Sequence, residues 1–232
     1  MEEQKQEEAL ISAIIGSVMQ KRWDAFWHAK RDSRFTKISW SKRRMMKILD
    51  KHVRKGTLVL DAGCGSGFFS DYFIAKGCQV YSLDYSEEAL DITRKVTQGK
   101  STKYLKRDLL KEDLRSEFNN TFDLIFTDGL LEHFSEQEQE QILKTFITMK
   151  REQGLIITFV PNRYSFWAVI RPIFVRGIEE SPFTLKELIS LVGRCGQKII
   201  SKGGINVLPF KYSPEILGGH FGMLLYVVSK EG

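Results

Sequence analysis

The stretch Leu58-Val59-Leu60-Asp61-Ala62-Gly63-Cys64-Gly65-Ser66-Gly67 decides the fold class. A short apolar run ends in an acid, three glycines follow at alternate positions, and a helical stretch over 68–76 comes next. Glycines allow a sharp turn and let a ligand approach the backbone where side chains would block it. A turn of this kind between a strand and a helix predicts a ligand site at the carboxyl edge of a parallel sheet.

Short β-rich runs alternate with helical stretches after this turn begins. We expect strands over 57–61, 79–84, 103–106, 122–128 and 155–160, and helices over 68–76, 86–96 and 135–149. This alternation predicts crossover connections and a mainly parallel sheet with helices on both faces. Two further strands, over 198–207 and 223–229, bring the doubly wound α/β sheet to seven strands. Thr184, followed three residues later by Glu187, has the capping-box pattern of a helix start.

The segments that flank the alternation predict a cap and a lid. One or two helices over 7–30 and another over 41–54 precede the first strand. We therefore expect residues 1–55 to form an N-terminal helical cap on a core of residues 56–232. Residues 162–180, rich in aromatics and arginine, interrupt the pattern and are expected to form a substrate lid. The chain length fits one domain with such appendages.

Composition argues against several protein classes. The 232 residues are 42% hydrophobic and 28% charged, which argues against disorder. The three cysteines form no CxxC pair, so we expect a reducing cytoplasm and neither a disulfide framework nor a structural zinc site. The acidic start over 1–8 and the interrupted apolar run over 9–18 argue against a signal peptide. Every apolar stretch is too short for a membrane span.

Positive charge is concentrated before the first strand. The formal net charge is +6 and the pI is about 9.1, and residues 30–55 hold eleven Lys or Arg against two Asp. A basic arm could bind RNA, an anionic lipid surface or an acidic substrate. Alternatively, the apolar residues of this segment follow helical spacing, which predicts a helix with a solvated basic face. That face would carry Lys42, Arg43, Lys47, Lys51 and Arg54.

Two acids limit the classes of ligand that the glycine turn could bind. Asp84 ends the second strand, 17 residues beyond Gly67, and an acid there can accept hydrogen bonds from both hydroxyls of a ribose. Asp61 lies two positions before the first glycine, where a pyrophosphate would bring negative charge. A cationic ligand suits this turn better, which disfavours a nicotinamide-dependent oxidoreductase although that fold shares much of the pattern.

The motif Asp61-Ala62-Gly63-Cys64-Gly65-Ser66-Gly67 resembles the first motif of class I methyltransferases, which use S-adenosylmethionine as cofactor. The order of elements over 57–160 also resembles the core of that family. The resemblance implies that Asp61 organises the turn and contacts the amino group of the cofactor. It also implies that the turn residues Gly63, Cys64, Gly65 and Gly67 lie beside its methionine part.

The same resemblance assigns the rest of the cofactor site. Asp84 would hold the ribose, and Tyr85 or Leu83 would lie against the adenine. Asp108, beside Leu109 after the third strand, would accept a hydrogen bond from the adenine amino group. Asp108 could instead be a helix cap or a turn residue, because Asp commonly takes both roles.

The end of the fourth strand is expected to line the active site. Asp128 stands at its tip, and Leu131-Glu132-His133 resembles a signature of methyltransferases that act on small molecules and lipid-like quinones. His133 could be a general base or could only orient the loop, and Asp128 is the second catalytic candidate. Glu132 and His133 also resemble part of a metal site in quinone O-methyltransferases. Gly129 stands where that pattern has a further carboxylate, so we expect no metal.

The sequence therefore predicts a methyltransferase that transfers a methyl group in line to a small, partly apolar acceptor. The candidates for acceptor contacts are Trp23, Trp27, Arg163, Tyr164 and Trp167. The arginines of the insert could meet an anionic ligand or a membrane surface. Two alternatives stay open: an RNA or protein methyltransferase that uses the segment 30–55, and a non-catalytic module that only binds the cofactor.

Overall fold

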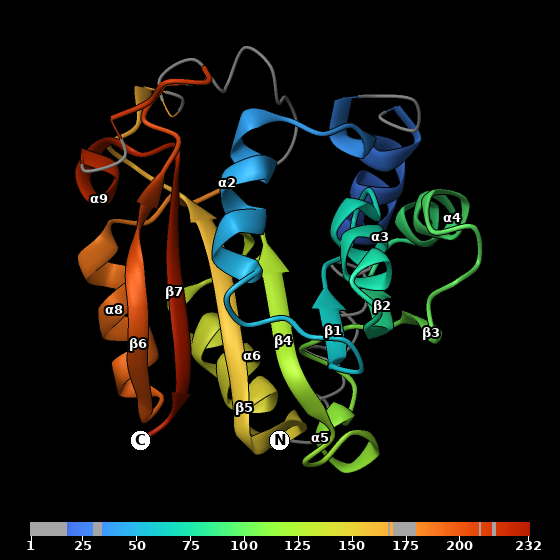
Figure 1. Cartoon of the computed structure of the whole chain (residues 1–232). Coiled ribbons are helices and arrows are strands. Elements are labelled where there is room, and N and C mark those ends of the chain that lie inside the picture. The colour runs from blue at the N-terminus through green and yellow to red at the C-terminus, as the bar shows by residue number, and fades with distance from the viewer. Residues whose placement is uncertain (1–17, 30–33, 167, 169–179, 209, 215–216) are drawn as a thin grey trace.

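The computed structural model of the chain describes residues 18–29, 34–166, 168, 180–208, 210–214 and 217–232. Within them, a seven-stranded sheet has the order β3-β2-β1-β4-β5-β7-β6 (Figure 1). The strands are β1 (Leu58–Ala62), β2 (Gln79–Asp84), β3 (Lys103–Lys106), β4 (Phe122–Asp128), β5 (Lys150–Pro161), β6 (Gln197–Ile205) and β7 (Leu224–Glu231). The first five are parallel, and β7 is antiparallel to β5 and β6. The prediction of a doubly wound, mostly parallel sheet is confirmed.

Helices cover both faces of this sheet. They are a helix over 18–29, α2 (Trp40–Leu49), α3 (Phe68–Ala75), α4 (Glu87–Val96), α5 (Leu114–Glu117), α6 (Glu136–Met149), α8 (Leu185–Arg194) and α9 (Gly218–Phe221). Two short 3₁₀ turns are η1 (Arg34–Thr36) and η2 (Leu131–His133). Figure 1 shows α2 in front of the sheet and α6 and α8 behind it. Among the helices that the structure describes, none combines the length and apolar character needed to cross a bilayer.

The alternation of side chains along the strands divides the core into two layers. Leu60 of β1 packs in a cluster with residues of α5, α6 and α8. Its neighbour Val59 points to the opposite face, toward α2 and α3. Successive strand residues point to opposite faces, so Asp61 lies on the same face as Val59 and meets α3. This alternation of side chains explains why Asp61, near the end of β1, is buried beside α3.

Side-chain caps fix where the longer helices begin. Thr184 and Glu187 form the predicted capping box at the start of α8, with each side chain accepting from the backbone N–H of the other. Ser135 and Glu138 form a second capping box at the start of α6. Such caps satisfy amide groups that the first helical turn leaves without partners. The capping-box prediction at Thr184 is confirmed.

The basic segment before β1 contributes helix α2, which ends at Leu49, earlier than the expected residue 54. Met45 and Leu49 are buried against the sheet, as the apolar spacing predicts. Lys42 is an exception to the predicted solvated face, since it lies one turn before Met45 on the buried stripe and reaches the cavity described below. Arg44 donates to Asn206 Oδ1 at 2.6 Å and to the carbonyl oxygen of Phe210 at 2.7 Å.

Candidate active site

A cavity of about 530 Å³ opens at the carboxyl ends of β1, β2 and β4. Its floor is the glycine turn after β1, and its sides are the ends of the neighbouring strands and the loop over 107–111. The helix over 18–29 and the turn η1 contribute an aromatic wall. This is the sheet edge at which the sequence predicts a ligand, and parallel α/β sheets generally bind ligands there.

The glycine turn is built for close approach. Gly63 and Gly65 have φ angles of +75° and +50°, a region that favours glycine. A Cβ at Gly63 would lie 3.1 Å from Leu130 Cδ1, and one at Gly65 would lie 2.5 Å from Trp27 Cζ2. The turn is therefore covered on one side by the N-terminal helix.

Gly67 has a different role from the one the resemblance implies. It is not among the described residues that line the cavity. A Cβ at this position would lie 2.7 Å from the Cα of Thr93 in α4, with φ at +71°. Gly67 thus allows α3 to begin against α4, which is a packing requirement of the fold.

Asp84 ties the glycine turn to β2. Its Oδ2 accepts from the backbone N–H of Gly65 and its Oδ1 from that of Ser86, both at 2.9 Å. Burial is the main cause that raises the pKa of this carboxyl to about 6, and the backbone bonds oppose it. Each carboxylate oxygen can accept more than one hydrogen bond, so Asp84 can also hold a ligand hydroxyl in the cavity that it lines.

Asp61 lies beneath the turn in a buried polar chain. Ser70 of α3 donates to Asp61 Oδ2 at 2.6 Å, and hydroxyl contacts continue from Ser70 to Ser82 and from Ser82 to Ser101. Burial raises the pKa of Asp61 to about 7, with a smaller contribution from the nearby charges of Asp128 and Asp84. The environment thus favours a cationic ligand, which would lower the cost of ionising Asp61.

Asp128 and Lys42 form a pair of opposite charges across the cavity. Burial raises the pKa of Asp128 to about 6, and the charge of Lys42 opposes the rise. Burial lowers the pKa of Lys42 to about 8, and Asp128 opposes that fall. Lys42 Nζ also donates to the carbonyl oxygens of Phe35 and Lys37, which fixes η1 over the pocket.

The residues expected at the adenine also line the cavity. Asp108 Oδ1 accepts from the backbone N–H of Leu110 at 3.0 Å. The side chain thus stabilises a turn, which is the alternative role expected from the sequence for this residue. Tyr85 and Leu109 lie on the same wall. Cys64 is buried, its thiol lies 3.4 Å from the Thr93 hydroxyl, and burial raises its pKa.

The aromatic wall comes from the N-terminal helix. Trp23, Phe26 and Trp27 pack edge to face, with ring centroids 5.7 and 5.1 Å apart along the series. Trp23 also meets the imidazole of His133 edge-on at 4.8 Å. Asp24 accepts a 2.5 Å hydrogen bond from the hydroxyl of Ser86 and thereby fastens this helix to the start of α4.

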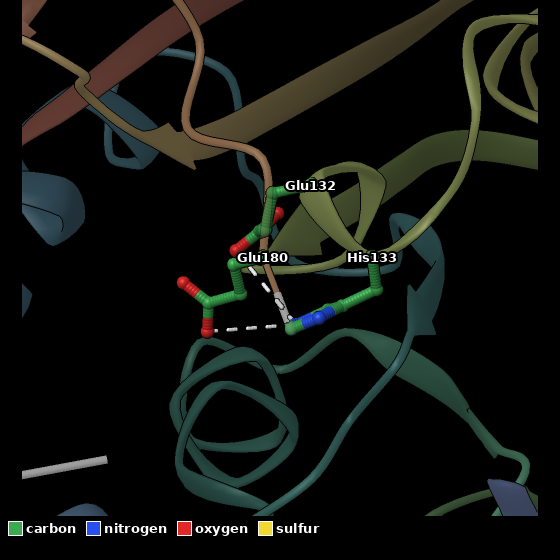
Figure 2. A group of neighbouring side chains, drawn as sticks. All are labelled: Glu132, His133 and Glu180. Carbon is green, nitrogen blue, oxygen red and sulfur yellow. Dashed lines mark ion pairs between the residues drawn. The ribbon is translucent and has the colours of Figure 1, made fainter. Parts of the chain in front are cut away.

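A second group of polar side chains lines the same cavity. Glu132 and His133 come from η2, directly after β4, and Glu180 comes from the chain before α8. His133 Nε2 lies 4.0 Å from Glu132 Oε1 and 3.8 Å from Glu180 Oε1. Figure 2 shows both carboxylates facing the imidazole.

The structure does not bring every predicted acceptor residue to this cavity. Arg163 pairs with Glu187 at 2.8 Å and Tyr164 is 65% exposed, and neither is among the described lining residues. Trp167 lies outside the described residues. Trp23 and Trp27 line the cavity as predicted.

Several lining residues were not predicted. They are chiefly Phe26, Phe35, Lys42 and Glu180. Phe26 and Lys42 could have been found from helical spacing, because they share faces with Trp23 and Met45 respectively. Phe35 lies in the three-residue turn η1 and Glu180 in an irregular segment, and neither is long enough for spacing to give a signal.

Comparison with known proteins assigns the central part of the chain. Residues 59–154 match the family model described as a methyltransferase domain. The central part of the chain is thus similar to a methyltransferase domain. The match covers the glycine turn, Asp84, Asp108, Asp128 and the pair Glu132 and His133, and it ends before Glu180.

Curated relatives are similar to part of the chain. Over 111 residues, the chain is 33% identical to a ubiquinone biosynthesis O-methyltransferase of Rhizobium etli, covering 47% of this chain and 43% of that protein. Over 103 residues it is 30% identical to phosphoethanolamine N-methyltransferase 3 of Arabidopsis thaliana, covering 44% of this chain and 21% of that protein. The chain thus spans less than half the length of each of these relatives.

Solved structures share the fold of nearly the whole chain. A methyltransferase of Anabaena variabilis described as S-adenosylmethionine-dependent superposes with a TM-score of 0.68 at 17% identity, covering 92% of this chain and 95% of the other. The 1,6-didemethyltoxoflavin-N1-methyltransferase of Burkholderia thailandensis, solved with S-adenosylhomocysteine, gives 0.67 at 18% identity, covering 94% and 89%. The chain therefore shares the fold of these methyltransferases well beyond the residues that match the family model.

Proposed function

We propose that this protein is an S-adenosylmethionine-dependent methyltransferase that acts on a small, partly apolar acceptor. The observation that carries the proposal is the arrangement of three acids, the buried Asp61 and Asp84 and the partly buried Asp128, around the glycine turn of one cavity. The family match and the names of the relatives support the same activity.

The residues of the cavity fit this cofactor. A sulfonium and an α-ammonium both carry positive charge, and carboxylates stabilise such groups in a site of low dielectric. Asp84 has the hydrogen-bonding capacity to hold a ribose, and Tyr85 and Leu109 offer surface for a base. The acids at the turn disfavour a pyrophosphate, which argues against a dinucleotide.

When bound, the cofactor supplies a methyl group on a sulfonium, whose S–C bond breaks as the acceptor forms its new bond to carbon and the electron pair stays on sulfur. The protein's task is to align the acceptor behind that methyl group and to exclude water. Trp23, Phe26 and Trp27 close the cavity over the turn and can do both. His133 also lines the cavity, and we propose that its imidazole, or a group bound to it, assists the loss of the proton from a hydroxyl acceptor.

The size and the lining of the cavity support a small acceptor. Its volume of about 530 Å³ accommodates both a cofactor and a small molecule of modest size. The aromatic wall suits an apolar or aromatic body, and the polar group around His133 suits a hydroxyl or an amine. Two of the basic residues that could serve an RNA-binding arm, Lys42 and Arg44, make contacts within the protein instead.

Calorimetry with S-adenosylmethionine and S-adenosylhomocysteine tests the proposal. We expect one saturable site, and an affinity about 10- to 100-fold weaker in Asp84→Asn because a carboxylate acceptor is lost. Asp71→Asn, on the exposed side of α3, is the matched control and should bind as the wild type does. Absence of binding, or equal binding by the two variants, would overturn the cofactor assignment.

A further inference from the structure

The geometry of Glu132, His133 and Glu180 points to a ligand that the methyltransferase core alone does not explain. One ligand atom from each of these three residues lies within 4.8 Å of the other two. The side chains are 3%, 9% and 12% exposed, respectively, so the group is well shielded from solvent. All three line the cavity (Figure 2).

The spacing of these atoms is close to that of a metal triad. Two ligands of an octahedral cation, each about 2.1 Å from the metal, stand roughly 3.0 Å apart when adjacent and 4.2 Å apart when opposite. The distances of 3.8 and 4.0 Å from His133 Nε2 to the two carboxylates lie within that interval.

The backbone holds Glu180 in place for this role. The N–H of Ser181, the next residue, donates to the carbonyl oxygen of Glu132 at 2.8 Å. Two residues further on, Phe183 exchanges hydrogen bonds with the chain at the end of β5, donating to Pro161 and accepting from Arg163. The segment that carries Glu180 is therefore fixed beside η2 by backbone bonds at two points.

Glycine at position 129 explains why the second carboxylate comes from elsewhere. A Cβ at Gly129 would lie 3.3 Å from Glu132 Oε1, so a carboxylate side chain there would stand directly at the group. Glycine carries no such group, and Glu180 supplies a carboxylate from outside the residues that match the family model. The motif at 129–133 alone therefore does not give this ligand set.

We propose that Glu132, His133 and Glu180 bind one divalent cation of the Mg²⁺, Mn²⁺ or Zn²⁺ class. Two carboxylates and one imidazole suit such borderline to hard cations, and a cation offsets the repulsion between two acids held close together. The proposal departs from the expectation that Gly129 rules out a metal. Because the triad faces the cavity, the remaining coordination positions are open to an oxygen of a bound molecule.

The consequence for catalysis rests on the proposed methyl transfer, whereas metal binding does not. A cation at this place would hold an acceptor through its oxygen and make that hydroxyl easier to deprotonate. It would also make Glu180 a link between the acceptor and the segment before α8. An acceptor with a hydroxyl or two neighbouring hydroxyls on an apolar body is the class that this site would select.

Titration of the chelator-treated protein with Mn²⁺, followed by the paramagnetic resonance of the free ion, tests the proposal without cofactor or turnover. We expect one site per chain, at least tenfold weaker in Glu180→Gln and in Glu132→Gln. Glu136→Gln, which changes an exposed glutamate of α6, is the matched control and should leave binding unchanged. Circular dichroism of each variant shows whether it is folded.

The outcome separates this inference from the proposed function. Saturable binding that both cluster variants weaken supports the metal site. Failure to bind either Mn²⁺ or, in a competition assay with a chromophoric chelator, Zn²⁺ would overturn it, as would equal binding by Glu180→Gln and the control. Calorimetry with S-adenosylhomocysteine on the same metal-free protein tests the cofactor site independently.

Discussion

The indole of Trp27 lies directly over Gly65, where a Cβ would meet its Cζ2 at 2.5 Å and its Cη2 at 2.7 Å. The glycine turn, which a ligand can approach closely, is thus also the surface against which the N-terminal helix packs. The close contact makes the two residues depend on each other. It links the part of the chain before residue 30 to the floor of the cavity.

Gly65→Ala should lower the free energy of unfolding by about 2–4 kcal/mol, because the methyl group collides with Trp27 and the positive φ strains the backbone. In a Trp27→Ala background the collision is gone, and only the strain of about 1 kcal/mol should remain. Denaturant unfolding of the two single variants and the double variant measures this coupling. Equal losses in both backgrounds would show that the contact does not contribute.

Gly67→Ala should destabilise the fold without weakening the cofactor site directly. Its Cβ would lie 2.7 Å from the backbone of Thr93, which cannot move aside as a side chain could, and we expect a loss of about 2–4 kcal/mol. Gly99→Ala is the matched control, since its φ of +72° is similar but its Cβ would meet open space. Its loss should be about 1 kcal/mol, from strain alone. Thermal unfolding and binding of S-adenosylhomocysteine at low temperature distinguish the two effects.

The buried acid Asp61 predicts a pH dependence of stability. Its pKa in the folded protein, about 7, lies above the ordinary value of 3.8, so folding favours the protonated form. This group therefore contributes stability below about pH 4 that is lost as the pH rises through 7. Asn cannot ionise, so Asp61→Asn should not lose this stability. Its free energy of unfolding should rise by roughly 2–4 kcal/mol relative to that of the wild type between pH 4 and pH 8. Denaturant unfolding at the two pH values measures it, and a constant difference between the proteins would contradict the pKa shift.

The hydrogen bond from Ser86 to Asp24 should control how firmly the N-terminal helix is held. Asp24→Ala removes the acceptor, so amide hydrogens of residues 18–29 should exchange about tenfold faster, equivalent to about 1.4 kcal/mol. Arg22→Ala, at an exposed position of the same helix, is the control. Mass-spectrometric hydrogen exchange gives the comparison. Equal exchange in the two variants would assign the helix's attachment to its aromatic contacts alone.

The sequence predicts the fold well because its signals are local and repeated. Strand alternation, glycines at a sharp turn and the capping box at Thr184 each depend on residues close in the chain, and the structure contains all three. The three acids of the site are predictable for the same reason, since Asp61, Asp84 and Asp128 end parallel strands and must meet at one edge.

The remaining site residues depend on information that local patterns lack. Arg163 lies in the aromatic and basic insert, yet its charge is used in a pair with Glu187 near the surface. The helical spacing of the apolar residues predicts Lys42 on the solvated face, whereas in the structure it lies one turn before the buried Met45 and lines the cavity. Glu180 reaches His133 only because the chain folds back against the end of β5, a contact that spans 47 residues.

The cavity is lined by residues from two parts of the chain, and only one of these parts matches a known family model. Its floor lies within residues 59–154, where relatives can be aligned, whereas Trp23, Phe26 and Glu180 on its walls lie outside that interval. A chimera that keeps 59–154 and exchanges the flanking segments would change the walls, and with them the acceptors that fit, while it keeps the floor that is proposed to bind the cofactor. The flanking segments are therefore the natural starting point for engineering.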